Sequence, residues 1–404
     1  MKKFNLILVA CGLTMVTSTQ AAGELPVSRD KVQYSHLVDG TKTQSLKGKG
    51  ASQESQVYYR EVSGEELNQG VELATDADNA VVKLTALKAA ASRNAMPQVP
   101  LDLELYKGET QRSVADPSIQ MKQTSEALRG AAPTMFKHSE VMKIPADMGR
   151  GRFKLKAKTP VQKDDRYLLY VLDQNSDIKL KLNSRKNAYA KGDKLDFDAQ
   201  VTSARKVKTV GMKTVLVSPD GRRFPIKSSS QGNGIRGNWK LDIDTQRAPG
   251  ELWQLEVEST VINDQQIETR RIAKVALDIH DATAVVDSIK TRKGHMMMGL
   301  NVQQKGRFEV RALVAGTDRD GSLKPISLTY YADWLERGMQ TVSFPIDKAL
   351  FQESGLSAPF VVQSVQLLDQ SRMAALDSRE GSWTFLRHDG FYWLFLLLGG
   401  LSYN

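Results

Sequence analysis

The chain has 404 residues, of which 41% are hydrophobic and 25% are charged, and its formal net charge is +10. A chain of this length is expected to form two or three domains, because a single core of that size is unusual. Cys11 is the only cysteine, so a mature chain that begins after it has no disulfide, no thiolate nucleophile and no cysteine-ligated metal.

Residues 1–22 have the layout of a secretory signal peptide. Two lysines precede an apolar run, and a polar stretch then leads to small residues at Ala21 and Ala22. The apolar run is too short to remain as a membrane anchor. We therefore expect an exported protein, periplasmic or secreted, with no transmembrane span in the mature chain. The alternative is a lipoprotein, because the residues around Cys11 resemble a lipobox.

The next two segments differ in composition. Residues 23–55 are polar and poor in aromatic residues, which predicts a flexible arm. Residues 56–176 are expected to form an N-terminal β-rich domain. Within it, we predict a short helix over Gly64–Gln69 with Ser63 as its cap, and a strand over Ala80–Leu87.

Basic residues then become frequent. Between Lys143 and Lys213 there are eighteen Lys or Arg, eight Asp and no Glu, a net charge of +10. Apolar residues alternate with polar ones in this segment, which predicts antiparallel strands with one solvent-facing side. The basic residues of two such strands are the candidate ligand-binding residues: Arg152, Lys154, Lys156, Lys158, Lys179 and Lys181.

Two Asp-Gly turns suggest an internal repeat in the second half of the chain. Asp220-Gly221 and Asp320-Gly321 are each followed, at equal spacing, by a Pro-Ile pair and then by strand-like segments. Asp-Gly suits a tight hairpin because both residues tolerate positive φ. A repeat of about one hundred residues fits an immunoglobulin-like sandwich. We predict two such sandwiches, at residues 177–281 and 282–386; chance likeness between two β-domains is the alternative explanation of the repeat.

Three stretches carry a resemblance to a known family. Tyr58–Leu67, Trp334–Gly338 and Val365–Asp369 resemble segments of an uncharacterised family of exported Gram-negative proteins, domain of unknown function 4785. The likeness covers most of Val57–Leu376. It implies consecutive immunoglobulin-like domains, in agreement with an all-β class, but it implies no catalytic or binding residue because its motifs are structural.

Common enzyme motifs are absent. The sequence has no Gly-x-Ser-x-Gly elbow, no His-Glu-x-x-His, no phosphate-binding loop ending in Lys-Ser or Lys-Thr, and no dinucleotide fingerprint. The five histidines lie far apart in sequence, although folding can still bring two of them together. We predict no cofactor.

Two segments offer possible metal ligands. Gly294–Gly299 contains His295 and three methionines, which suit Cu(I). In a strand, however, neighbouring side chains point to opposite faces, so we interpret the methionines as core residues. Asp318–Gly321 begins like a calcium loop but lacks the third acid and the distant Glu. We interpret it as a hairpin turn and predict no metal site.

The apolar residues Phe391–Leu398 lie within a C-terminal tail, 387–404, that is too short to span a membrane by itself. This tail has two interpretations, a buried last strand or a partner-docking segment.

The basic strands also have two interpretations, a solvated sheet face that protects an edge or a surface that binds anions.

The function that we predict is an exported, non-catalytic binding or envelope-associated protein. Its partner is an anionic envelope glycan, a lipid headgroup or an acidic protein, and not nucleic acid, because no aromatic residues alternate with the lysines as base stacking requires. The alternative is an enzyme, or an accessory subunit of an exported hydrolase, with its site in the N-terminal domain.

Overall fold

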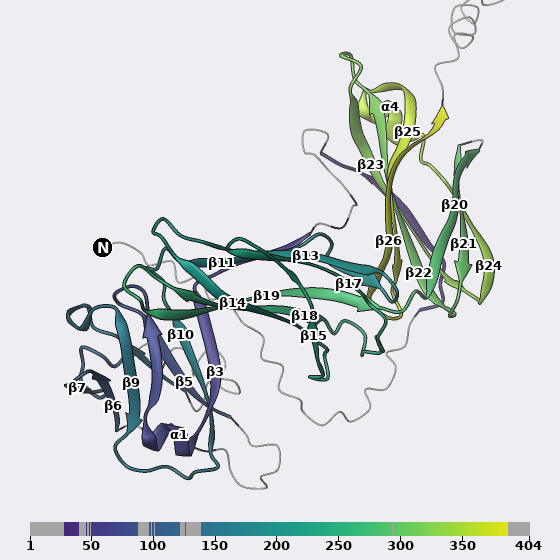
Figure 1. Cartoon of the computed structure of the whole chain (residues 1–404). Helices are drawn as coiled ribbons and strands as arrows, with labels where there is room; N and C mark the ends of the chain where they lie inside the picture. Colours follow the sequence, from purple (N-terminus) through teal and green to yellow (C-terminus); the bar gives the residue numbers. More distant parts are fainter. Residues whose placement is uncertain are drawn as a thin grey trace, which may run out of the picture.

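The computed structural model describes residues 28–39, 46, 48, 50–87, 97, 99–100, 102–121, 126, 139–292 and 294–386. Within these residues the strands form six sheets, arranged as three domains with the middle domain between the other two (Figure 1). The predicted all-β class is confirmed, with an N-terminal β-rich domain followed by two immunoglobulin-like sandwiches. The predicted signal peptide at 1–22 and the tail at 387–404 lie outside the described residues.

The N-terminal domain consists of two antiparallel sheets, with the orders β3-β10-β5-β8 and β4-β9-β6-β7. Helix α1 (Gly64–Gln69) joins β3 to β4 and has the predicted cap. The Ser63 hydroxyl accepts a hydrogen bond from the Glu66 backbone N–H, and the Glu66 carboxylate accepts one from the Ser63 backbone N–H. The strands are β3 (Val57–Ser63), β4 (Val71–Thr75), β5 (Val81–Leu87), β6 (Leu103–Lys107), β7 (Thr110–Ser113), β8 (Ser139–Lys143), β9 (Gly151–Ala157) and β10 (Arg166–Leu172), with a 3₁₀ turn, η1, at Ala146–Met148.

The middle domain packs two five-stranded sheets against each other, with the orders β16-β17-β13-β11-β2 and β12-β19-β18-β14-β15. Short strand β12 runs parallel to β19. The strands are β2 (Ala51–Ser55), β11 (Lys179–Ser184), β12 (Ala188–Ala190), β13 (Lys194–Thr202), β14 (Lys208–Val217), β15 (Arg223–Ile226), β16 (Ser229–Gln231), β17 (Gly234–Lys240), β18 (Trp253–Ile262) and β19 (Glu268–His280).

The C-terminal domain has a three-stranded sheet, β20-β21-β24, and a five-stranded sheet, β1-β23-β22-β25-β26. A short helix, α4 (Ala349–Ser354), connects β24 to β25. The strands are β1 (Val32–Leu37), β20 (Ala284–Arg292), β21 (His295–Val302), β22 (Gly306–Thr317), β23 (Leu323–Leu335), β24 (Gly338–Pro345), β25 (Ser357–Asp369) and β26 (Ala374–Leu386).

The two sandwiches share one strand order. The order β15-β14-β18-β19 in the middle domain corresponds to β23-β22-β25-β26 in the C-terminal domain, and β17-β13-β11 corresponds to β24-β21-β20. The two Asp-Gly turns occupy equivalent hairpins, β14–β15 and β22–β23, where Gly221 and Gly321 have φ values of 88° and 81°. The repeat in the sequence is therefore a repeat of strand order.

The prediction of a flexible arm at 23–55 is wrong for two of its segments. Strand β1 pairs antiparallel with β23 of the C-terminal domain, and β2 pairs antiparallel with β11 of the middle domain. Both are visible in Figure 1 as purple strands beside later parts of the chain. Composition gave no sign of this pairing because an edge strand is held by main-chain hydrogen bonds, which polar residues form as readily as apolar ones.

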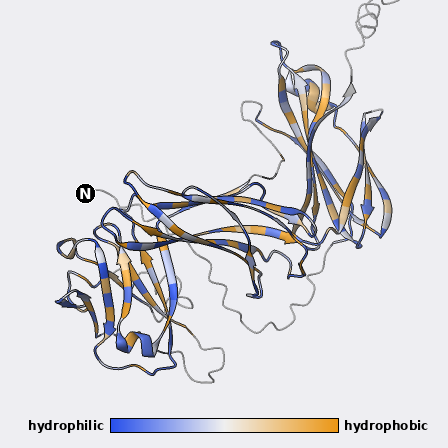
Figure 2. Ribbon diagram, in the orientation of Figure 1, coloured by the Kyte–Doolittle hydropathy of each residue, from blue (hydrophilic) through white to orange (hydrophobic). Residues whose placement is uncertain are grey.

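Each domain has its own cluster of buried apolar side chains. The clusters extend from Tyr58 to Val171, from Ile178 to Ile279 and from Ala284 to Leu367, and Ile272 of β19 packs into the first of them. Figure 2 shows hydrophobic and hydrophilic residues interleaved along the strands, as expected when one face of each sheet is buried.

A buried polar network joins the N-terminal domain to the middle domain. Arg271 and Asp173 are both fully buried, and Arg271 Nη2 donates to Asp173 Oδ2 at 2.8 Å and to Ser176 Oγ at 2.8 Å. Arg271 also donates to the carbonyls of Ile178 and Arg270. Asp173 in turn accepts from the backbone N–H of Asp76 at 2.7 Å. These bonds satisfy a charge pair that would otherwise be costly to bury.

A second contact between the same two domains centres on Glu256 of β18. Its carboxylate accepts from the Tyr59 hydroxyl at 2.6 Å and from Arg223 at 3.0 Å, and it pairs with Lys274 at 3.0 Å. Burial opposes the charged form of Glu256, but the Lys274 ammonium and the donated hydrogen bonds lower its pKa below the usual value.

Candidate functional site

Three of the predicted ligand-binding residues stand on the outer side of β9. Arg152, Lys154 and Lys156 point away from the core, whereas Phe153 and Leu155 between them are buried, with 2% and 0% exposure. The alternation predicted from the sequence is therefore confirmed. Successive cations along this face are about 6.6–6.8 Å apart along the strand, because side chains on one face of a strand recur every second residue.

The strands on either side of β9 bring acidic residues to the same face. Glu72 of β4 lies opposite Lys154, and Glu104 of β6 lies opposite Lys156. Tyr106 of β6 is the other neighbour of Lys154. The face is thus a row of cations flanked by two carboxylates and a phenol, and it is less uniformly basic than the composition of the segment suggested.

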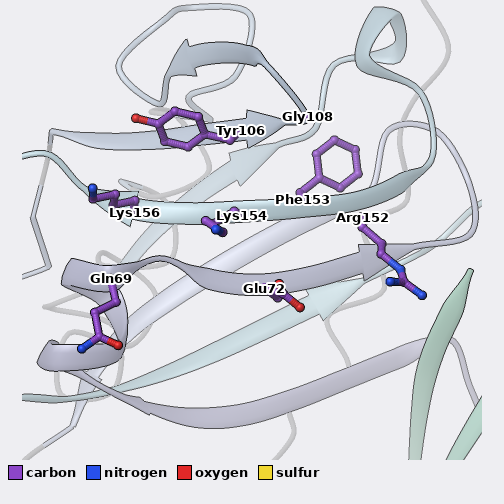
Figure 3. Close-up of a pocket in the computed structure, with 8 residues that line it drawn as sticks. All are labelled: Gln69, Glu72, Tyr106, Gly108, Arg152, Phe153, Lys154 and Lys156. Atoms are coloured by element: carbon purple, nitrogen blue, oxygen red, sulfur yellow. The ribbon is translucent and has the colours of Figure 1, made fainter.

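A shallow groove of about 450 Å³ follows this part of the sheet. Figure 3 shows Lys154 and Lys156 between Tyr106 on one side and Gln69 and Glu72 on the other. We call this feature the β9 groove. The residues that line it are Gln69, Glu72, Tyr106, Gly108, Arg152, Phe153, Lys154 and Lys156.

Helix α1 shapes one wall of the β9 groove. Gly70 directly follows the helix and has a φ of 106°, a conformation that L side chains rarely adopt. A Cβ at this position would meet the Lys154 side chain at Cδ and Cγ. The alkyl part of Lys154 therefore crosses the end of the helix where only glycine leaves room.

The cations of the β9 groove have no ion-pair partner among the described residues. In the part of the chain that the structure describes, no side-chain hydrogen bond or ion pair is found for Arg152, Lys154 or Lys156. Glu72 likewise has none there. Charged groups that are left unpaired in a concave surface are available to a ligand.

The other three predicted residues lie elsewhere. Lys158 is exposed and follows the end of β9, where Thr159 donates hydrogen bonds to Asp102 and, with the charge of Lys158, lowers the pKa of that carboxyl. Lys179 and Lys181 stand on β11 of the middle domain, and Lys179 is paired with Glu54 at 2.8 Å. The structure thus brings together three of the six.

Gln69, Glu72 and Tyr106 were not among the predicted site residues. Their strand or helix is separated from β9 by many residues, and only the pairing of β4 and β6 with β9 brings them to the groove. The Tyr106 hydroxyl donates to Glu104 at 2.6 Å, and this bond raises the pKa of Tyr106. No local motif in the sequence marks these three residues as a group.

Comparison with protein families identifies the chain. Residues 24–173 match the N-terminal domain of the domain of unknown function DUF4785, and residues 282–384 match its C-terminal domain. The chain belongs to the DUF4785 family. No curated protein matches it.

One solved structure shares the fold of this DUF4785 protein. A crystal structure of a DUF4785 family protein from Legionella pneumophila is 21% identical, with a TM-score of 0.73 over 89% of this chain and 94% of that chain. At this identity the likeness shows the fold alone. A mutant of Salmonella alpha-2-macroglobulin is 9% identical over 86% of this chain and 24% of its own, with a TM-score of 0.22. The adhesin domain of Epf from Streptococcus pyogenes is 11% identical over 56% and 77%, with a TM-score of 0.16.

The two possible metal segments of the DUF4785 chain have structural roles. Met296 and Met298 of β21 are fully buried in the C-terminal core, while His295 is exposed. Asp318–Gly321 forms the β22–β23 turn, where the backbone N–H of Gly321 donates to the Asp318 carbonyl at 3.0 Å. Among the described residues, no group of three His, Cys, Asp or Glu side chains is placed to hold a metal ion.

Two of the five histidines, His138 and His388, lie outside the described residues. His36 is exposed on β1, and His280 is buried at the end of β19, where its ring nitrogens contact the carbonyls of Asp281 and Ala375.

None of the helices in the described ranges has the length and apolar character that a membrane crossing requires.

Proposed function

We propose that this protein is an exported, non-catalytic binding protein that contacts an anionic envelope ligand through the β9 groove. The observation that carries the proposal is the set of Arg152, Lys154 and Lys156, which line one concave surface and have no partner among the described residues. By contrast, Lys179 on the middle domain is neutralised by Glu54. A row of cations that form no ion pair with the neighbouring carboxylates attracts anions from solution.

The neighbours of the cations favour a saccharide over a lipid headgroup or an acidic protein. Glu72 and Gln69 offer oxygen acceptors and an amide donor beside Lys154, and these groups suit the hydroxyls of a sugar. Glu72 would also repel a dense cluster of negative charge. The ligand class that fits both features is an extended glycan in which anionic groups alternate with hydroxyls, such as a uronic acid polymer.

The experiment compares two pairs of lysine variants with the same loss of charge. Lys154→Gln with Lys156→Gln removes two cations of the β9 groove, and the control, Lys179→Gln with Lys181→Gln, removes two from the middle domain. The probes are polygalacturonate, neutral dextran, and vesicles of phosphatidylglycerol or phosphatidylcholine. Binding to the mature protein is measured by calorimetry or sedimentation at low and high salt.

We expect polygalacturonate to bind at low salt and binding to weaken steeply as salt rises, because the Debye length falls from about 10 Å at 0.1 M to about 3 Å at 1 M. The groove variant should lose binding and the control should keep it. Binding only to phosphatidylglycerol vesicles would identify a lipid headgroup instead. Equal binding by both variants, or no binding to any anionic probe, would show that the face is merely solvated.

A further inference from the structure

Strand β1 belongs to a domain that is formed almost entirely by the other end of the chain. Its six residues pair one by one with β23, from Val32 opposite Ala332 to Leu37 opposite Ser327. It is the outermost strand of its sheet. In sequence, Ser35 and its partner Thr329 are 294 positions apart.

The core of the C-terminal domain does not depend on β1. None of the residues Val32–Leu37 belongs to the apolar cluster of that domain, and its larger apolar side chains remain open to solvent, with Val32 41%, Tyr34 52% and Leu37 38% exposed. What holds the strand is the main-chain ladder and a few outward contacts. Leaving the edge therefore removes no side chain from that cluster.

The outward contacts are specific to this sequence. The ring of Tyr34 stacks on that of Tyr330 with centroids 4.6 Å apart, and the hydroxyls of Ser35 and Thr329 are hydrogen-bonded at 2.9 Å. Just before the strand, Arg29 lies over the Trp334 ring, with its guanidinium carbon 4.7 Å from the ring centroid.

A buried arginine extends the site beyond the ladder. Arg307, 7% exposed, donates from Nη1 to the backbone carbonyls of Ser28 at 2.8 Å and Asp30 at 2.5 Å. Arg307 of β22 and Trp334 of β23 thus hold the residues just before β1, while Tyr330 and Thr329 of β23 contact its middle.

We propose that the β23 edge is a strand-binding site and that β1 of a second copy of this chain can occupy it, giving a strand-exchanged dimer. Each contact described above joins β1, or the residues 28–30 just before it, to the C-terminal domain, so the exchanged segment would form the same contacts between copies. The occupant that this edge fits best is β1 itself, because Tyr34, Ser35 and Arg29 meet their partners only in this register.

The balance between the two forms is set by concentration. Within one copy, β1 and the β23 edge belong to the same chain, so their effective concentration does not change on dilution, whereas exchange between copies depends on protein concentration. The monomer therefore dominates in dilute solution, and exchange increases when chains fold together at high concentration. The two forms differ in partner but not in the bonds they contain.

The test uses single cysteines in the mature chain, which has no other cysteine when it begins at Gly23. Ser35→Cys on one copy and Thr329→Cys on another are combined in equal amounts, unfolded, refolded together and oxidised. Because these positions face each other directly, a disulfide between copies forms only if β1 has crossed to the other molecule. A control mixture replaces Thr329→Cys with Ser118→Cys, an exposed position on the N-terminal domain.

We expect a disulfide-linked heterodimer from the Ser35→Cys and Thr329→Cys mixture, and its fraction should rise with protein concentration during refolding. The chain that carries both cysteines should instead close an internal disulfide in dilute solution. A second facing pair, His36→Cys with Leu328→Cys, repeats the test if either first variant folds poorly. Heterodimer no more abundant than in the control, with both pairs and at every concentration, would overturn the proposal.

Discussion

Replacing Arg271 with alanine should destabilise the contact between the N-terminal and middle domains. Arg271 is fully buried and donates four hydrogen bonds, to Asp173, Ser176, Ile178 and Arg270. Its loss leaves the Asp173 carboxylate buried without a counter-charge. Removing one partner of a buried ion pair costs about 3–5 kcal/mol, and we expect Arg271→Ala to fall in that range.

The assay is urea unfolding followed by circular dichroism and tryptophan fluorescence. With urea dependences of about 1–3 kcal/mol per M, the midpoint of the affected transition should fall by more than about 1 M. Arg270→Ala is the matched control, because Arg270 is 47% exposed and its pair with Glu258 spans 3.6 Å. A surface pair of this kind contributes about 0.2–1 kcal/mol.

Two further measurements make the reasoning refutable. Burial raises the pKa of Asp173, so protonation at low pH should remove the stranded charge, and the deficit of Arg271→Ala should be smaller at pH 4 than at pH 7. The double variant Arg271→Met with Asp173→Asn should recover much of the loss, because neither of these two positions then carries a buried charge. A double variant as unstable as Arg271→Ala, or a single variant as stable as Arg270→Ala, would contradict the account.

Three other predictions concern single positions. A Cβ at Gly237 would overlap the Phe197 ring, so Gly237→Ala should destabilise the middle domain by about 1–3 kcal/mol, as measured by thermal unfolding. The pKa of Glu256 is lowered in the folded protein, so its contribution to stability is present at pH above the usual pKa of Glu and is lost as pH falls through the folded pKa. Glu256→Gln should remove this pH dependence from a series of unfolding midpoints. Met296→Ala should lower the free energy of unfolding by about 2–5 kcal/mol, because the side chain is fully buried. Met297→Ala, at a half-buried position, should change the urea midpoint little. Neither variant should alter a Cu(I) titration.

The sequence predicted those parts of the fold that depend on short-range pattern. The alternation around Phe153 and Leu155 placed Lys154 on the solvent side of β9, and the Ser63 cap has the predicted geometry. The two Asp-Gly turns form hairpins where predicted, but only their glycines, and not Asp220 or Asp320, have a positive φ. These features depend on residues a few positions apart, so their signals are contained in a single segment.

Features that depend on distant pairing could not be predicted in this way. Nothing near Glu72 or Tyr106 indicates that both flank Lys154. The sequence therefore predicts the cations of the groove but not the residues beside them. The same holds for β1. Its polar composition resembles that of a flexible arm, and its pairing with β23 leaves no local signal because partners such as Tyr330 lie far along the chain. Charge counting likewise overestimated the basic face, since it could not assign Glu54 to Lys179.

The position of β1 has a consequence for the order in which the chain assembles. The ribosome produces β1 well before its partner strand, because Thr329 of β23 follows Ser35 of β1 by 294 positions. Contacts between residues so far apart form late in folding, because the chain loses the entropy of closing a long loop before the contact stabilises it. Strand β1 is thus synthesised before the other described strands but pairs only after most of them have formed. A truncated chain that ends before Leu323 lacks β23, so β1 has no strand to pair with. Unpaired strands of this kind promote aggregation.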